Sequence, residues 1–126
     1  DNLLIDSTRA TPRVTVVDWQ SFVVGPPLSD LAYLLGASVL PEARRPVERE
    51  IVRAYHARLL EAGVRDYSFE RCWTDYRRGS FAGFAVAVIA SMIVQETERG
   101  NEMFLAMASR HARHALDLGA EEFLKK

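Results

Sequence analysis

Two short apolar stretches near the start of the chain constrain its fold more than any other feature. Residues 3–5 read Leu-Leu-Ile and residues 14–17 read Val-Thr-Val-Val, and a segment rich in Ser, Thr and Pro separates them. Strand-forming runs on either side of such a segment predict a β-hairpin over residues 2–6 and 13–18. Both faces of the second run are apolar, so we expect the isolated hairpin to expose apolar surface and strand edges that favour self-association.

The hairpin carries two oxygen-bearing side chains at one end. Asn2 stands where the first strand begins and Asp18 where the second ends. In an antiparallel hairpin these positions lie at the same end, so a carboxamide oxygen and a carboxylate can converge on one point. Mg²⁺ is bound by such oxygens, commonly one or two from the protein together with phosphate oxygens and water. The alternative is an ordinary hairpin in which Asn2 and Asp18 are turn-forming residues.

Four runs of residues carry a resemblance to a known group of enzymes. They are Asp1-Asn2-Leu3-Leu4-Ile5, Val17-Asp18-Trp19-Gln20, Gly25-Pro26-Pro27-Leu28-Ser29-Asp30-Leu31-Ala32 and Asp75-Tyr76-Arg77-Arg78-Gly79. The first three resemble aminoglycoside phosphotransferases and choline kinases, and the last is similar to the branch that includes ecdysteroid-kinase-like proteins. The resemblance implies a mainly α chain with one β-hairpin, namely the C-terminal lobe of a protein-kinase-like fold with a helical subdomain after the metal-binding hairpin.

The resemblance also implies roles for particular residues. The catalytic loop of this superfamily reads His-x-Asp-x-x-x-x-Asn; its Asn and a downstream Asp hold Mg²⁺, and its Asp is the base. By resemblance Asn2 and Asp18 are the two metal ligands, and Asp30 braces the catalytic loop through hydrogen bonds to its backbone. The base would lie five residues before Asn2 in this pattern, upstream of Asp1. We therefore expect a chain cut within the catalytic loop, without its nucleotide-binding lobe and inactive alone.

The implied function of the parent protein is transfer of a phosphoryl group from ATP, with Mg²⁺, to the hydroxyl of a small-molecule alcohol. By resemblance Asp75, Tyr76 and Arg77 are an acceptor-side or lobe-bracing cluster; the alternative is a solvated helical turn. A different class of function is a non-catalytic helical interaction module that dimerises through the hairpin. A third is a regulatory domain that binds an apolar ligand among its helices.

Length and composition suit one partial domain. A chain of 126 residues can form a single domain with a modest core. We expect residues 1–24 to hold the metal-site hairpin and its following loop, and residues 25–126 the helical part of the lobe. A net charge of -1 does not indicate a nucleic-acid or membrane partner. The single cysteine, Cys72, excludes an intrachain disulfide and fits a reducing cytoplasm, and we expect it to be a buried small apolar residue.

The charge balance of the helical part bears on the acceptor. Residues 42–126 contain 14 Lys or Arg and 13 Asp or Glu, a net of +1. A site for a polycationic aminoglycoside is usually rich in carboxylates, for Coulombic reasons. The balance therefore favours a neutral, anionic or amphiphilic acceptor, such as a sterol, a sugar or a choline-like alcohol.

The first half of the helical part predicts two helices joined by a loop. Pro27 or Leu28 begins the first helix, and Gly36 to Arg45 is predicted as a loop. The second helix is predicted over residues 46–62, with Glu48 on its solvated face and Gly63 as its C-terminal stop.

The second half predicts two longer helices. Ser68 is a good N-cap for the third helix, whose nearly all-apolar run over residues 81–94 is too short to span a bilayer. We expect this run to be the buried centre of the domain. Residues 96–101 are predicted as an irregular junction and residues 102–118 as the last helix. Its basic stretch, residues 110–114, would complement the helix dipole.

Overall fold

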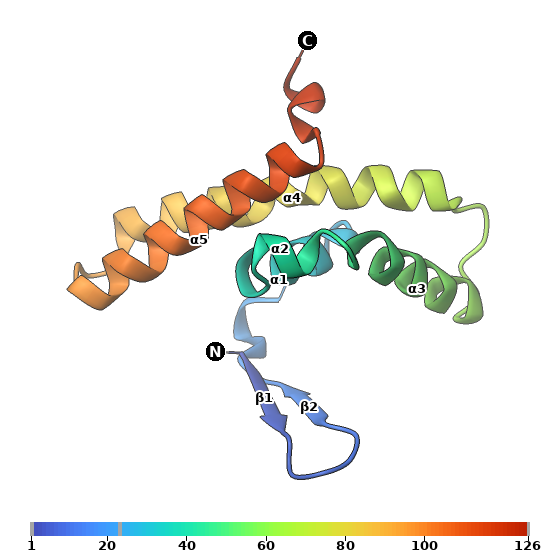
Figure 1. Cartoon of the computed structure of the whole chain (residues 1–126), viewed down its shortest axis with the longest axis horizontal. Coiled ribbons are helices and arrows are strands. Elements are labelled where there is room, and N and C mark those ends of the chain that lie inside the picture. Colours follow the sequence, from blue (N-terminus) through green and yellow to red (C-terminus); the bar gives the residue numbers. More distant parts are fainter. Residues whose placement is uncertain (1, 23, 126) are drawn as a thin grey trace.

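The chain is mainly helical with one two-stranded hairpin, as predicted (Figure 1). The computed structural model describes residues 2–22 and 24–125. Its elements in chain order are β1 (Leu3–Asp6), β2 (Arg13–Val16), the 3-10 turn η1 (Trp19–Ser21), α1 (Leu28–Ser38), α2 (Pro41–Arg44), α3 (Glu48–Glu61), α4 (Phe69–Ile93), α5 (Glu98–Asp117) and the 3-10 segment η2 (Ala120–Leu124).

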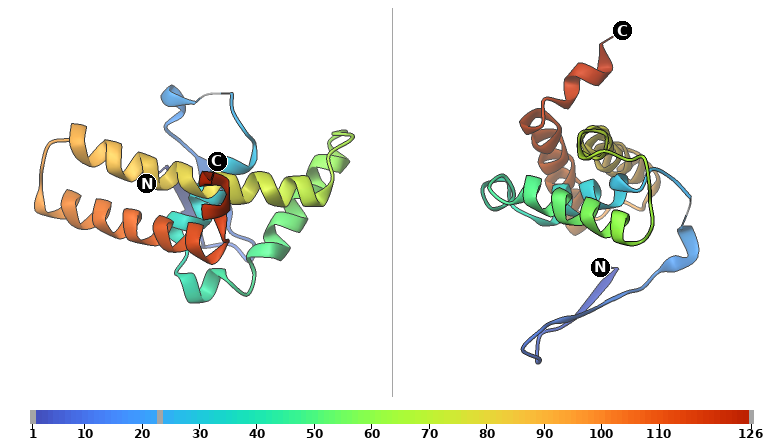
Figure 2. Two further views of the ribbon diagram at one scale, coloured as in Figure 1. Left: turned by 90° about the horizontal axis from the view of Figure 1, so that it is seen from above. Right: turned by 90° about the vertical axis from the view of Figure 1, so that its right-hand side faces the viewer.

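The hairpin forms with the predicted antiparallel pairing. Leu3 faces Val16 across the ladder and Ile5 faces Val14. The Asp6 carboxylate accepts hydrogen bonds from the Thr8 backbone N–H (3.0 Å) and hydroxyl (2.6 Å), which closes the turn. Figures 1 and 2 show the hairpin standing away from the helices, and its apolar side chains, such as Ile5 at 63%, are exposed. The expectation that this hairpin exposes apolar surface is confirmed.

The predicted loop from Gly36 to Arg45 is largely helical, so that prediction was wrong. The helix α1 continues through Gly36 to Ser38, and α2 begins at Pro41 after a single short break. Proline is compatible with the first position of a helix because its φ is already fixed and its missing N–H would have no partner there. Gly36 lies within α1, and its lack of a side chain allows α5 to approach, as described below.

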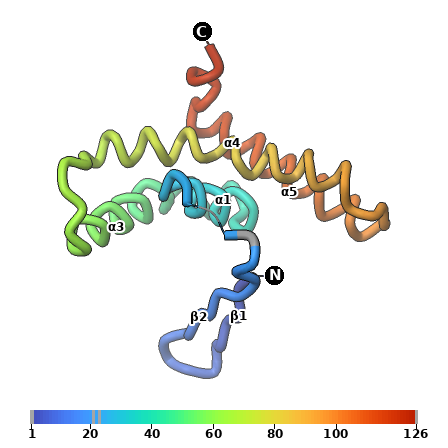
Figure 3. Tube along the Cα trace, turned by 180° about the vertical axis from the view of Figure 1, so that it is seen from behind, coloured from blue at the N-terminus to red at the C-terminus, as the bar shows by residue number. Residues whose placement is uncertain are grey.

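The core lies where α1, α3 and α4 meet. Three helices contribute its buried cluster. The residues are Leu28, Ala32 and Leu35 of α1, Val52 of α3, and Cys72 and Tyr76 of α4. Burial of Cys72 is as predicted and raises the pKa of its thiol. Figure 3 shows α4 running the length of the helical part, with α3 and α1 against its first half and α5 against its second.

The second half of α4 is exposed rather than buried, so the prediction for residues 81–94 was wrong. Only Gly83 and Ala87 of this stretch are buried, whereas Ile89 and Met92 are 59% and 79% exposed. Figures 1 and 2 show α5 running beside this part of α4, whereas α3 lies against the first half of α4. We call this pair of helices, residues 81–93 of α4 with residues 98–110 of α5, the α4–α5 arm.

The junction between the two arm helices is shorter than predicted. Thr97 caps α5, because its hydroxyl accepts a hydrogen bond from the Gly100 N–H at 3.0 Å. Residues 98–101 are therefore helical. The Ser68 cap of α4 is confirmed, with its hydroxyl accepting from the Arg71 N–H, and Gly63 ends α3 at a positive φ of 95°.

No helix within residues 2–22 and 24–125 combines the length and the apolar character that a membrane span needs.

The helices α1, α4 and α5 pack closely around one histidine. His111 of α5 is fully buried, and its ring lies against Gly83 of α4 and Gly36 of α1. A Cβ at Gly83 would stand 2.0 Å from His111 Cε1, and one at Gly36 would stand 2.5 Å from His111 Nδ1. The two glycines therefore make room for the imidazole.

Replacing Gly83 by Ala should destabilise the chain, because both the ring and the helix backbone would have to shift. Overpacking of this kind costs about 1–3 kcal/mol, more than the gain in helix propensity from Ala. Urea unfolding followed by circular dichroism measures the change. Gly25→Ala is the control, since a Cβ there meets nothing within 4 Å. Equal stability of the two variants would contradict this packing.

Candidate functional site

Asn2 and Asp18 lie at the same end of the hairpin, as predicted. Asn2 immediately precedes β1, and its carbonyl accepts a hydrogen bond from the Val17 N–H at 3.0 Å. Asp18 is the next residue after Val17, so the two predicted metal ligands lie at the end of the backbone pairing. Both residues are exposed.

The backbone at Asp18 takes an uncommon conformation. Its φ of 67° and ψ of 51° are left-handed, and Asp66 is the other non-glycine residue with a positive φ within the described part of the chain. Aspartate tolerates this region better than most residues. Asp18 does not use its side chain to cap η1. The indole N–H of Trp19 donates to the Val16 carbonyl at 3.0 Å and fixes the turn.

These two side chains offer oxygens that suit a hard cation. A carboxamide oxygen and a carboxylate match the donors that Mg²⁺ takes from proteins, with phosphate and water completing its shell. Residues 2–22 and 24–125 contain no cluster of three or more His, Cys, Asp or Glu side chains that could hold a metal without such additional ligands. The donors present therefore fit a metal that arrives with a phosphate ligand.

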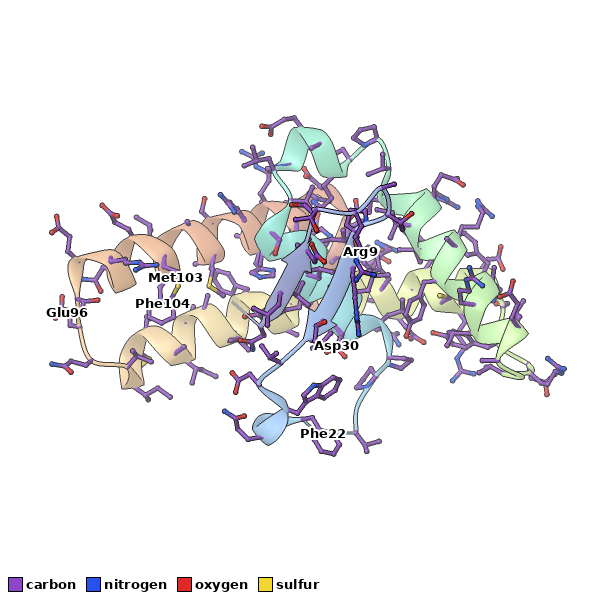
Figure 4. All side chains as sticks on the ribbon, turned by 90° about the horizontal axis from the view of Figure 1, so that it is seen from below. Arg9, Phe22, Asp30, Glu96, Met103 and Phe104 are labelled. Carbon is purple, nitrogen blue, oxygen red and sulfur yellow. The ribbon has the colours of Figure 1, made fainter. Side chains whose placement is uncertain are left out.

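Asp30, the predicted brace of the catalytic loop, lies in the first turn of α1 (Figure 4). It is exposed, and an acidic side chain there is stabilised by the positive end of the helix dipole. Figure 4 also shows Phe22 on the loop that leads from the hairpin to this helix. The bracing contact itself stays a prediction.

Asp75 and Arg77 of the predicted acceptor-side or lobe-bracing cluster point to different partners. The Asp75 carboxylate accepts a hydrogen bond from the Tyr67 hydroxyl at 2.9 Å, which ties the start of α4 to the loop before it. Arg77 donates to the carbonyls of Leu118 (2.8 Å) and Gly119 (3.0 Å), just after α5. Each side chain holds a neighbouring segment to α4.

Tyr76 belongs to a buried polar network. Its hydroxyl donates to Glu48 Oε1 at 2.6 Å and lies 3.0 Å from His114 Nε2, which is itself 2.6 Å from the same carboxylate oxygen. Arg44 donates to both Glu48 oxygens, at 2.8 and 2.7 Å, and to Asp117 at 2.6 Å. We call these five residues the Glu48 network; they join α2, α3, α4 and α5.

Sequence reasoning missed this network. It placed Glu48 on a solvated face of its helix, whereas Glu48 is only 5% exposed. Arg44 and Glu48 are four residues apart, a spacing that favours ion pairs on a helix. Because residues 36–45 were predicted as a loop, that signal was lost. The contributions of Tyr76 and His114 depend on tertiary packing and have no local sequence signal.

Hydrogen bonds keep Glu48 ionised despite its burial. Burial acts to raise the pKa of its carboxyl, but hydrogen bonds from His114, Tyr76 and Arg44 outweigh that effect and hold the pKa below its usual value. Burial and the neighbouring Glu48 raise the pKa of the Tyr76 hydroxyl, so it remains a donor. The network therefore has the charge state of a stable structural ion pair.

A shallow hollow of about 290 Å³ adjoins the network. It is lined by Arg45, Glu48, Arg49, Trp73, Asp117 and Leu118. Arg45 is paired with Asp117 at 2.8 Å, and the Arg49 guanidinium lies 5.1 Å from the Trp73 ring centre. Tyr76 and His114 are fully buried behind it. The two carboxylates among the described lining residues, Glu48 and Asp117, are already paired with Arg44 and Arg45.

The hairpin and the helices that follow it define the class of protein. The fold is the C-terminal lobe of a kinase-like protein, with its two candidate metal ligands on the hairpin. The family model of the ecdysteroid kinase-like family matches residues 1–65, so the chain belongs to this family. The matched part contains the hairpin, α1, α2 and α3, and α4 and α5 follow it. No curated protein and no solved structure matches the chain.

Removing one member of the buried ion pair should cost far more than removing an exposed one. Arg44→Leu leaves Glu48 buried without its cation, a loss of about 3–5 kcal/mol. The control is Arg58→Leu, whose 2.9 Å pair with Glu61 has side chains 83% and 63% exposed, so the loss there should be below about 1 kcal/mol. Chemical denaturation of both variants measures the difference, and similar losses would contradict the buried network.

Acid should destabilise the chain through His111, which was predicted to belong to a cationic stretch. Burial, with His114 beside it, lowers the pKa of His111 to about 4, so it is neutral at pH 7. Neither ring nitrogen has a hydrogen-bond partner among the described residues. Between the ordinary histidine pKa of about 6.5 and pH 4, mainly the unfolded state binds this proton. The free energy of unfolding therefore decreases as the pH is lowered, by at most about 1.4 kcal/mol per pH unit.

Unfolding free energies at pH 7 and pH 5 test this expectation. His111→Leu should reduce the difference in unfolding free energy between pH 7 and pH 5, because leucine cannot be protonated in the unfolded chain. His56→Gln is the control, since His56 is partly exposed and hydrogen-bonded to the Tyr67 carbonyl. If His111→Leu leaves this pH dependence of the unfolding free energy unchanged, groups other than His111 cause it. Glu48 and Asp117, whose pKa values are lowered, lose their contribution only at lower pH.

Proposed function

We propose that the parent protein of this chain is an ATP-dependent phosphotransferase that acts on a hydroxyl group of a small molecule. The observation that carries the proposal is membership of the ecdysteroid kinase-like family over residues 1–65, a range that includes Asn2, Asp18 and Asp30. The hairpin geometry supports it, because it sets a carboxamide and a carboxylate at one end of a β-ladder.

In this proposal Asn2 and Asp18 hold Mg²⁺. Asp18 supplies a full negative charge and Asn2 only a dipole, so Asp18 contributes more to holding the cation. Asp18 has a left-handed backbone, which is uncommon for a residue other than glycine. Uncommon backbone conformations of this kind concentrate at functional sites. The bound metal would neutralise charge on the β- and γ-phosphates. Asp30 would brace the catalytic loop from the start of α1.

The proposed organisation assigns residues 1–24 to the metal-site hairpin and its following loop, and residues 25–126 to the helical part of the lobe. The catalytic base of the family pattern falls outside the 126 residues, five positions before Asn2. We therefore expect these residues alone to be inactive, since neither the base nor a nucleotide-binding lobe is among them.

The proposed acceptor is a neutral, anionic or amphiphilic alcohol. Support comes from the charge balance of residues 42–126, with 14 basic and 13 acidic side chains. Several of the acidic groups are already engaged: Glu48 and Asp117 are paired with Arg44, and Asp75 is bonded to Tyr67. Fewer free carboxylates remain for a polycationic aminoglycoside.

Asp18→Asn in the full-length protein should abolish Mg²⁺-dependent binding of ATP and lower turnover at least about a hundredfold. The substitution keeps the size and the tolerance for a left-handed backbone but removes the charge that holds the metal. Calorimetric titration of ATP with and without Mg²⁺ measures binding without knowledge of the acceptor. Asp66→Asn is a matched control, because Asp66 is also exposed and has a positive φ of 56°.

Turnover and Mg²⁺-dependent binding within a few-fold of the wild type in Asp18→Asn would refute the assignment. Loss of both in Asp66→Asn as well would point to a general effect of the substitution on folding.

A second candidate is a non-catalytic module that associates through the hairpin. The exposed strand side chains favour it, with Leu4, Ile5 and Val14 exposed by 58%, 63% and 54%. Mg²⁺-dependent ATP binding by the full-length protein distinguishes the two candidates, because an interaction module has no need of it.

A further inference from the structure

The α4–α5 arm exposes an apolar helix face that the proposed kinase function does not use. Five apolar side chains at helical spacing form this α4 outer face: Phe81, Ala85, Val88, Ile89 and Met92. Val88, Ile89 and Met92 are exposed by 41%, 59% and 79%. Gly83 and Ala87, by contrast, are buried.

The surroundings of the α4 outer face make exposure to water unfavourable. The 17 residues from Gly79 to Gln95 include no charged side chain. Soluble monomers rarely expose a continuous apolar surface of this kind, and such surfaces mark interaction sites. The nearby hollow of about 240 Å³ lies between α4 and α5 and includes only Val88 of the face. The face itself therefore suits a helix surface better than a small ligand.

Two residues of opposite charge flank this face along the chain. Arg78 lies at the base of the arm, where it is exposed and 4.9 Å from the Phe123 ring centre. Glu96 lies at the tip, just beyond the end of α4 (Figure 4). The tip, residues 95–102, contains three Glu and one Arg and is therefore acidic.

This arrangement complements itself under a two-fold axis. If a second copy packs antiparallel, with the axis near Ala85 and Ile89, Arg78 of each chain meets Glu96 of the other. Parallel packing would place the two acidic tips together and the two Arg78 side chains together. Ala85 at the centre is small, which allows two helix axes to approach within the usual 8–10 Å.

We propose that the α4 outer face is the interface of a homodimer in which two α4 helices pack antiparallel. The interface is isologous, with the same residues contributed by both chains. The face lies on α4, far along the chain from Asn2 and Asp18, and the proposal does not depend on the metal-site assignment.

Sedimentation equilibrium of the 126-residue chain from about 1 to 200 µM tests the proposal, since this range covers weak dimers. The wild type should approach the dimer mass. Ile89→Glu should weaken association at least about a hundredfold, because it buries a charge at the centre of the interface. Ile5→Glu and Leu116→Glu, at residues 63% and 61% exposed but outside the face, should leave the dimer intact. Circular dichroism verifies that each variant is folded.

Charge reversal tests the antiparallel arrangement separately. Arg78→Glu or Glu96→Arg alone should weaken the dimer roughly tenfold, because two exposed ion pairs become repulsive. The double reversal should restore the wild-type dissociation constant. A wild-type chain that stays monomeric at the highest concentration overturns the proposal. So does a dimer that Ile5→Glu dissociates and Ile89→Glu does not, or a double reversal that fails to restore association.

Discussion

The helical part of this protein depends on one buried carboxylate. Glu48 begins α3 and accepts hydrogen bonds from Arg44 of α2, Tyr76 of α4 and His114 of α5. Asp117 completes the charge balance by pairing with Arg44. A buried carboxylate is tolerated only where its charge is paired and its oxygens are satisfied. The observed arrangement of the four helices brings all of these donors to Glu48.

This central junction divides the molecule into a packed part and two exposed extensions. Beside the network, His111 fills the space that Gly36 and Gly83 leave open, so α1, α4 and α5 are tightly apposed. The hairpin on one side and the α4–α5 arm on another extend beyond that junction with apolar side chains exposed, as Ile5 and Met92 illustrate. Exposed apolar surface favours association. The hairpin holds the proposed chemistry, and the arm is proposed to hold the contact with a second copy.

The features that sequence reasoning predicted correctly are local ones. The hairpin follows from two apolar runs and a polar turn, and with it the placement of Asn2 and Asp18 at one end. The Ser68 cap and the Gly63 stop are likewise set by neighbouring residues. Glu48 and His111 could not be assigned in this way, because the helix pattern does not reveal which helix covers which face. The exposure of the second half of α4 escaped prediction for the same reason: an apolar run does not indicate whether a partner lies against it.

The most direct test of the central claim is a crystal structure of the full-length protein with Mg²⁺ and a non-hydrolysable ATP analogue. The account predicts that a carboxylate oxygen of Asp18 and the carboxamide oxygen of Asn2 both lie about 2.0–2.1 Å from Mg²⁺, with phosphate oxygens and water completing an octahedral shell. A metal held by other residues, with Asp18 turned to solvent, would contradict the assignment of this hairpin as the metal site.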